Sequence, residues 1–242
     1  MKGKMDLNYD ALTLRKQLGA DGYSPLDILS LTATNSELTL VFYPFNENIS
    51  GICIKNNQVK LIAINSNMTD GRQRYTIAHE LYHLYFHENF GRFICNMDMN
   101  FSKDPIEKEA DQFASYFIVP YDALRDFITV KIGKQKGDIS IEDVVCIEQT
   151  FKLSRQATLC RLLDDGFLSQ KKADLMKTGV KSSASQLGYD TTLYEHSKEN
   201  RMSYTLGRYV SLAQKLHKND LISEGKLNEL LLSAFRSDLV FG

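Results

Sequence analysis

The stretch Tyr75-Thr-Ile-Ala-His-Glu-Leu-Tyr-His-Leu-Tyr-Phe86 decides how this chain is interpreted. It lacks proline and glycine and is apolar on nearly every side, so it predicts a buried helix. His79 and His83 are four residues apart and therefore share one face of that helix. Two imidazoles on one face can bind one metal ion, and Zn²⁺ favours nitrogen ligands. Glu80 follows the first histidine, where its carboxylate can meet a water at the metal.

The alternative is an ordinary buried helix whose histidines form hydrogen bonds. Two histidines and a glutamate are costly inside a core unless a ligand or hydrogen bonds satisfy them. The spacing therefore favours a metal site, and its surroundings predict the remaining ligand.

A catalytic zinc usually has three protein ligands and one water. His87 continues the helical face, but each step of four residues drifts by ~40°, so its side chain turns away from a metal held by His79. The metzincin pattern requires glycine and histidine where this chain has Phe86 and Asn89. We therefore interpret His87 as a residue of the helix C-terminus or of a cleft wall.

A second helix is predicted over 106–117, because positions 106, 110, 113, 114 and 117 are apolar. Glu107 and Asp111 lie four residues apart on one edge of it, whereas Glu109 points about 200° away. We expect Glu107 to bind the zinc and Asp111 to accept the outer N–H of a ligating histidine, His79. The alternative is that both carboxylates are solvated, as most are.

Segments 72–83, 107–114 and 117–120 together resemble the ImmA/IrrE family of zinc-dependent metallopeptidases, which are similar to the gluzincins. The resemblance extends over residues 10–165 and is most specific over 72–120. It implies one zinc ion per chain, with His79, His83 and Glu107 as ligands and Glu80 as the catalytic acid and base. Tyr82 departs from the family pattern, in which glycine is frequent at that position.

The resemblance also implies a function. Members of the family cleave or relieve transcriptional repressors encoded nearby, often in mobile elements or stress responses. A zinc endopeptidase acting on a helix-turn-helix repressor is therefore the expected activity. A protein that keeps the zinc but only sequesters a repressor or antitoxin is the alternative.

The predicted fold class is α+β. Runs rich in β-branched and aromatic residues at 37–43, 51–55 and 59–65 predict a short sheet before the zinc helix, with a turn at Asn56-Asn57. A small zincin-like catalytic domain followed by a helical C-terminal region is expected. The predicted parts are a peptidase domain (1–135), a helix-turn-helix-like segment (136–180), a polar linker (181–202) and a C-terminal helical region (203–242).

Several finer expectations concern the surroundings of the site. The run 59–65 could form an exposed sheet edge that binds a peptide as an added strand. Asp70 with Gln73 resembles a capping box, and 89–104 is interpreted as a loop or irregular hairpin. Tyr116 and Tyr121 are candidates for stabilising an oxyanion.

Helix caps are predicted at Ser140, Ser154 and Ser169, and two final helices are expected over 203–217 and 223–235.

Helix, turn and helix over 139–166 have the spacing of a DNA-binding motif, with Arg155, Gln156, Thr158 and Arg161 on the second helix. A helix-turn-helix regulator is therefore a further alternative. The acidic residues of this segment oppose attraction to phosphates, so direct nucleic-acid binding is not expected.

Composition agrees with an ordinary globular protein: 242 residues, 43% hydrophobic and 24% charged, with a net charge of −1. The four cysteines form no Cys-x-x-Cys pair, so neither a disulfide framework nor a cysteine zinc site is expected, and reduced thiols suggest the cytoplasm. No signal peptide or membrane span is evident. The sequence does not indicate an oligomeric state.

Overall fold

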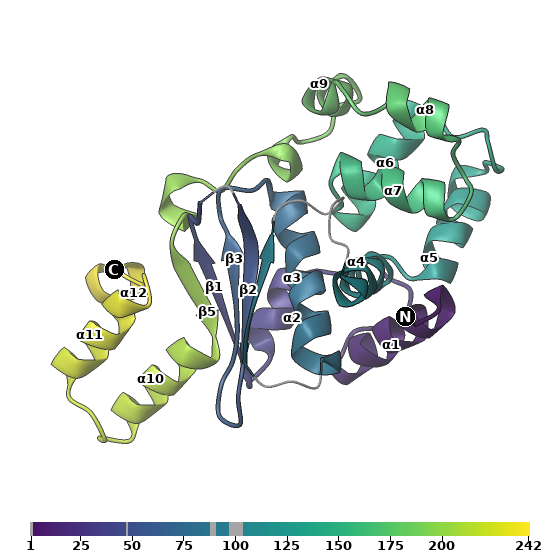
Figure 1. Cartoon of the computed structure of the whole chain (residues 1–242). Coiled ribbons are helices and arrows are strands. Elements are labelled where there is room, and N and C mark those ends of the chain that lie inside the picture. Colours follow the sequence, from purple (N-terminus) through teal and green to yellow (C-terminus); the bar gives the residue numbers. More distant parts are fainter. Residues whose placement is uncertain (1, 47, 88–90, 97–103) are drawn as a thin grey trace.

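The structure is a computed structural model that describes residues 2–46, 48–87, 91–96 and 104–242. Its strands are β1 (Leu38–Tyr43), β2 (Ile49–Lys55), β3 (Lys60–Asn65), β4 (Gly91–Asn96) and β5 (Tyr204–Gly207). Within the described residues these strands form one sheet in the order β4-β2-β3-β1-β5 (Figure 1). β1 and β3 are parallel, whereas the other neighbouring strands are antiparallel.

The hairpin between β2 and β3 has the predicted turn. Asn56 N donates to Val59 O at 2.9 Å, and Asn56 Oδ1 accepts from the backbone N–H groups of Gln58 and Val59 at 2.8 and 2.7 Å. The asparagine side chain thus replaces part of the backbone hydrogen bonding of the turn.

Helices of the N-terminal half lie on one side of this sheet (Figure 1). They are α1 (Lys4–Gln17), α2 (Ile28–Thr34), α3 (Asp70–Phe86) and α4 (Pro105–Ile118). α3 packs directly on β2 and β3, and α4 packs on α3, so that α1 and α4 lie in an outer layer. The fully buried side chains between these layers include Leu40, Ile62, Ile64, Ile77, Leu81, Phe113 and Phe117. The α+β fold class is thereby confirmed.

The chain after Pro120 is mostly helical until β5. Its elements are α5 (Tyr121–Asp126), a π-helix (Phe127–Ile132), α6 (Ile141–Phe151), α7 (Arg155–Asp164), α8 (Gln170–Leu175), α9 (Val180–Gln186) and the 3₁₀ turns Thr192–Tyr194 and Glu199–Arg201. The predicted caps at Ser140, Ser154 and Ser169 are confirmed, and Asp143 completes a capping box with Ser140. Val144 and Leu162 join the same apolar core as the sheet.

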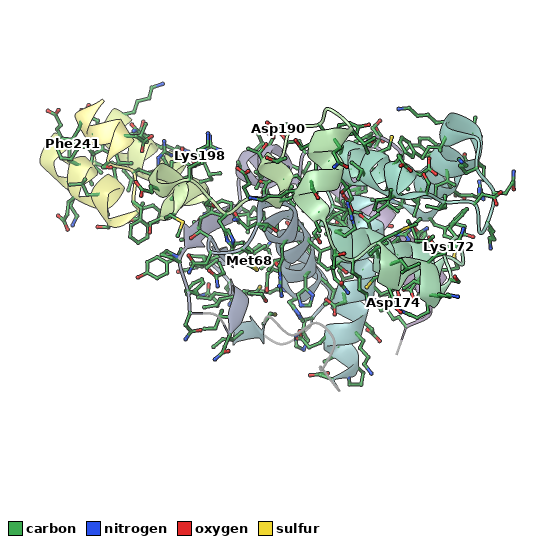
Figure 2. The ribbon with its side chains drawn as sticks, turned by 90° about the horizontal axis from the view of Figure 1, so that it is seen from above. Met68, Lys172, Asp174, Asp190, Lys198 and Phe241 are labelled. Carbon is green, nitrogen blue, oxygen red and sulfur yellow. The ribbon has the colours of Figure 1, made fainter. Side chains whose placement is uncertain are left out.

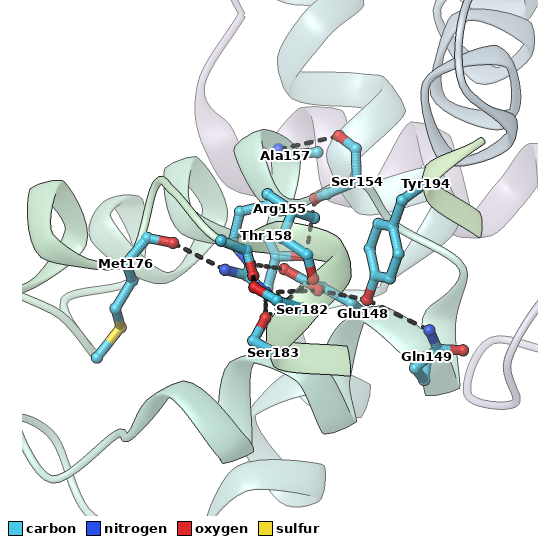
Figure 3. A network of polar contacts seen from close by, with 12 residues as sticks. Glu148, Gln149, Ser154, Arg155, Ala157, Thr158, Met176, Ser182, Ser183 and Tyr194 are labelled. Carbon is cyan, nitrogen blue, oxygen red and sulfur yellow. Dashed lines mark hydrogen bonds and ion pairs between the residues drawn. The ribbon is translucent and has the colours of Figure 1, made fainter. Parts of the chain in front are cut away.

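A buried polar network holds this helical part together (Figure 3). The Arg155 guanidinium pairs with the carboxylate of Glu148 and donates to Met176 O at 2.8 Å and Ser183 Oγ at 2.9 Å. Tyr194 Oη donates to Glu148 Oε2 at 2.7 Å. A buried charge is tolerated when it is paired and hydrogen-bonded in this way. The network therefore fixes α7 against α6, α8 and α9.

Two predictions about the sheet are wrong. Residues 91–96 form β4 rather than a loop or irregular hairpin; residues 97–103 lie outside the described residues. The run 59–65 is a strand, β3, but it lies between β2 and β1 and is not an exposed edge. β4 and β5 are the edge strands, and β4 pairs with β2, on which α3 packs.

The predicted linker 181–202 and the helix predicted from 203 are also corrected. Residues 180–186 form α9, and Leu193 and Tyr194 are buried. Residues 204–207 pair with β1 as β5. Gly207 ends this strand with φ 83°, and a Cβ there would lie 2.4 Å from Leu38 O, so only glycine allows this close approach.

The start of α3 differs from its prediction as well. Its N-cap is Thr69, without a side-chain hydrogen bond, and Asp70 and Gln73 form no capping box. Gln73 Nε2 instead donates to Met68 O at 2.6 Å, and the Asp70 carboxylate accepts from Arg74. Other local hydrogen bonds thus take the side-chain groups that a capping box would have used.

The C-terminal helices are α10 (Arg208–Lys218), α11 (Glu224–Ser233) and α12 (Asp238–Phe241). Ala213, Leu227 and Leu231 form a small apolar cluster between them, separate from the main core. Seen from above, these helices, with Phe241, lie at the opposite end of the molecule from Lys172 and Asp174 of α8 (Figure 2). Among the described residues, none of the helices is both long and apolar enough to cross a membrane.

Candidate metal centre

α3 presents two histidines to one point. His79 and His83 are 7% and 1% exposed, and their Nε2 atoms lie 3.2 Å apart. The helix holds them there because four residues return to the same face. Each imidazole therefore directs a potential ligand nitrogen to the space between α3 and α4.

Glu107 approaches the same point from the first turn of α4. Asp104 caps this helix by accepting the Ile106 N–H at 2.9 Å, which fixes where its first turn begins. Glu107 Oε2 lies 3.2 Å from His79 Nε2, and Glu107 Oε1 lies 3.4 Å from His83 Nε2. Ligand atoms ~2.0–2.1 Å from a tetrahedral zinc are about 3.3 Å apart. The three side chains therefore fit a zinc ion in their present positions.

Asp111 lies one turn further along α4. Its Oδ1 atom is 2.8 Å from His79 Nδ1, the contact expected from the sequence. The Nδ1–H group donates to this carboxylate, which leaves Nε2 directed at Glu107 and His83. Such a bond fixes the tautomer of a ligating histidine and raises its basicity.

The charges of the metal-free cluster favour a cation at its centre. Burial opposes the charge of His79, but hydrogen bonds to Asp111, Cys95 and Glu107 together raise its pKa well above the usual value. Burial and then the neighbouring His79 lower the pKa of His83 to about 4. A proton on His79 thus occupies the position that a metal ion would take, and metal binding must displace it.

Glu80 is completely buried, with an exposed fraction of 0%. Within the described part of the chain, neither carboxylate oxygen has a hydrogen-bond partner that meets normal geometry. Burial raises the pKa of Glu80 to about 7. An unsatisfied buried carboxyl is costly and contributes nothing to packing that glutamine or methionine would not. A buried carboxyl with a raised pKa beside such a cluster is a candidate functional group.

Gly51 of β2 provides the space for this carboxyl group. A Cβ at position 51 would lie 2.5 Å from Glu80 Oε1 and 2.9 Å from Thr76 Cγ2. The sheet therefore approaches α3 closely because it has no side chain at this position.

Cys95 of β4 completes the cluster, and the sequence did not predict it. Its sulfur lies with ligand atoms of His79, His83 and Glu107, all within 4.8 Å of one another. Cys95 is therefore a potential ligand by position, whereas the sequence predicted no cysteine zinc site. The β-prone run before Cys95 was a signal for a strand, but only the sheet pairing brings its sulfur to α3.

The region that contains this cluster is similar to a known protein family. The family model described as the IrrE N-terminal-like domain of peptidases matches residues 35–163. The chain belongs to this peptidase family. The matched region contains the sheet strands β1 to β4 and both ligand-bearing helices. Membership supports a metallopeptidase-type function, and the family is typically metal-dependent. A comparison with curated proteins gives no match.

Three other residues singled out in the sequence of this IrrE-like domain have structural contacts of their own. His87 caps the C-terminus of α3 and is not part of the cluster. Tyr116 is 1% exposed, and the Cζ atom of Arg161 lies 4.3 Å from the centroid of its ring. Tyr121 begins α5, where its N–H donates to Asn8 Oδ1 at 3.1 Å. An oxyanion role for either tyrosine stays a prediction.

In the segment that resembles a DNA-binding motif, three of the four candidate DNA-contacting side chains are buried. Arg155, Thr158 and Arg161 are 4%, 1% and 2% exposed. Arg155 pairs with Glu148 (Figure 3), and Arg161 donates to Asp165, Ser115 and Val119. Side chains that are buried in this way cannot reach base edges or phosphates. Gln156 is the exposed residue of the four.

Gly51→Ala is expected to reduce peptide hydrolysis by about 100-fold while the metal is retained. The atoms nearest to the new methyl group belong to Glu80 and Thr76, so it displaces the Glu80 carboxyl, and a ~1 Å misplacement can cost this much in rate. Cleavage rates and metal content of the purified variant measure both effects. Gly225→Ala in α11, where a Cβ meets nothing closer than 4.0 Å, is the control. An unchanged rate in a folded Gly51→Ala protein would contradict this role for Glu80.

Glu80 should also make the metal-free protein less stable as pH rises. Its folded-state pKa of about 7 lies above the ordinary 4.5, so the folded state binds more protons between these values. Unfolding free energy therefore falls through this range, by about 3 kcal/mol in total. Glu80→Gln removes this term. Denaturant titrations in the presence of a chelator should show that the unfolding free energy of the variant rises relative to that of the wild type between pH 4.5 and pH 7. A difference in unfolding free energy that does not change with pH would refute the raised pKa of Glu80.

Proposed function

We propose that this protein is a zinc-dependent endopeptidase that hydrolyses a peptide bond in a partner protein, a helix-turn-helix transcriptional repressor encoded nearby. The supporting observation is the buried, unsatisfied carboxyl of Glu80 beside three ligand side chains at zinc-compatible separations. A site that only binds metal for structure has no use for this carboxyl.

His79, His83 and Glu107 would hold one zinc ion, with Asp111 orienting His79. When bound, zinc supplies a Lewis acid that polarises a carbonyl and makes water acidic near neutral pH. Glu80 accepts a proton from the attacking water on one carboxylate oxygen and delivers it to the leaving nitrogen. In the metal-free protein burial raises the pKa of Glu80 to about 7, and a group that both accepts and donates a proton works best with a pKa near the working pH.

The substrate would reach the site along β4. This strand is an edge of the sheet, and its Cys95 lies at the metal cluster. An extended peptide can pair with such an edge through main-chain hydrogen bonds. Binding of this kind requires an extended segment in the repressor and depends little on its side chains.

Sequestration of a repressor without cleavage is the second candidate, and the C-terminal helices favour it. Exposed apolar side chains are numerous there, as expected of a surface that binds a protein. They include Leu212, Leu216, Leu221, Leu232, Leu239 and Phe241. In the endopeptidase proposal the same helices hold the repressor for cleavage, so the two candidates differ in chemistry rather than in this surface.

Removal of α10 to α12 should separate repressor binding from the metal site. A chain that ends after Gly207 keeps β5 and loses helices whose apolar cluster is separate from the main core. We expect it to fold and retain zinc but to lose capture of the repressor, measured by pull-down. A truncation after residue 180 is unsuitable because it removes β5. If the shorter chain captures the repressor as well as the full chain does, the C-terminal helices are not the repressor-binding surface.

The proposal is tested by loading the purified protein with zinc and incubating it with the candidate repressor. One zinc per chain and repressor fragments that disappear with a chelator are expected. Zinc-independent cleavage, or an intact repressor with fully loaded protein, would argue against it.

A further inference from the structure

Cys95 has a defined position opposite Gly51. β4 pairs with β2 in antiparallel fashion, and Cys95 is the register partner of Gly51. Directly opposed residues of an antiparallel pair lie on the same face of a sheet. Gly51 faces Glu80 of α3, so the side chain of Cys95 also lies on the α3 face. Cys95 is 3% exposed.

The sulfur is placed among ligand atoms rather than among apolar side chains alone. Ligand atoms of Cys95, His79, His83 and Glu107 all lie within 4.8 Å of one another. Buried free cysteines are common as small apolar residues, but such a role does not require three polar ligand groups around the sulfur.

Cys53 provides a comparison within the same sheet. It lies two residues beyond Gly51 on β2, so it shares the face of Gly51, and it is 0% exposed. It is nevertheless outside the cluster. Burial on this face is therefore not sufficient to bring a sulfur to the ligand atoms; the register of Cys95 does so.

We propose that Cys95 Sγ is a fourth ligand of the metal, so that this conformation is a partly latent form of the peptidase, which cleaves slowly until the sulfur leaves. The inference rests on the proposed zinc site. Zinc sites with four protein ligands are closed and structural, whereas catalytic sites keep one position for water or substrate. Departure of the sulfur leaves His79, His83 and Glu107 and opens that position. The thiol releases its proton to solvent when it binds and regains one when it leaves.

X-ray absorption at the zinc edge of the full-length, zinc-loaded protein tests this directly. One sulfur neighbour at ~2.3 Å is expected, together with nitrogen and oxygen neighbours. Cys95→Ala should lose the sulfur neighbour and keep the others, and Cys53→Ala, the matched control, should keep it. With Co²⁺ in place of zinc, the wild type and Cys53→Ala should show thiolate-to-metal charge-transfer absorption, and Cys95→Ala should not. Cys95→Ala should also cleave the repressor faster than the wild type.

The outcomes separate this inference from the proposed function. Zinc bound by nitrogen and oxygen alone in the unmodified protein overturns the fourth ligand and leaves the peptidase proposal intact. A sulfur neighbour with no gain in cleavage for folded, zinc-loaded Cys95→Ala overturns latency. Failure of the unmodified protein to bind zinc rejects the proposed function itself. The first measurement needs no variant, so misfolding of Cys95→Ala cannot obscure it.

Discussion

Glu80→Gln is expected to abolish repressor cleavage while the fold and the metal are retained. Glutamine has nearly the same shape, so it fits the space that Gly51 leaves beside α3. Its amide cannot accept a proton from water, and general acid–base groups contribute typically ~10²–10⁴-fold in rate. Single-turnover cleavage assays should show a loss of this size.

Two further measurements make this result specific. Metal analysis of Glu80→Gln should give the wild-type zinc content, because Glu80 is not among the ligand atoms of the cluster. Glu142→Gln, the same change at an exposed position of α6, should cleave at the wild-type rate. The inactive variant should still bind the repressor and could retain it in a pull-down. Cleavage by Glu80→Gln at the wild-type rate would contradict the acid–base role of Glu80.

Glu107→Ala is expected to cause the second large effect, loss of the metal. It removes the oxygens that lie 3.2 and 3.4 Å from the two histidine nitrogens. Loss of an outer hydrogen-bond partner alone weakens metal binding by ~10–100-fold, and removal of a ligand should exceed this. Competition with a chromophoric zinc chelator measures the change.

Glu109→Ala is the control for this experiment. Glu109 is on the same helix, but its Oε2 atom accepts from Tyr82 Oη at 2.6 Å and does not join the cluster. Its removal should leave zinc affinity unchanged. If His87→Ala releases the metal and Glu107→Ala does not, the third ligand is wrongly assigned.

The sequence predicted features that depend on spacing along one helix. His79 and His83 meet because they are four residues apart, and the contact of Asp111 with His79 follows from two such helices packed together. The caps at Ser140 and Ser154 were predictable because capping is local. The ligand roles of these residues remain predictions until a metal is measured.

The features that the sequence did not predict depend on distant partners. β5 has four residues and is a strand because β1 lies beside it, whereas its own composition does not distinguish it from the start of α10. The central position of β3 depends on its parallel pairing with β1, which no local pattern encodes. Cys95 reaches the cluster only through its register with Gly51, so the cysteine spacing alone suggested no metal site.

The most direct test is mass spectrometry of the candidate repressor after incubation with the zinc-loaded protein, alongside Glu80→Gln loaded with the same amount of zinc. We predict two fragments from one cleaved peptide bond with the unmodified protein and intact repressor with the variant. If Glu80→Gln relieves repression as well as the unmodified protein does, with no fragments from either, the function is sequestration and the peptidase account is contradicted.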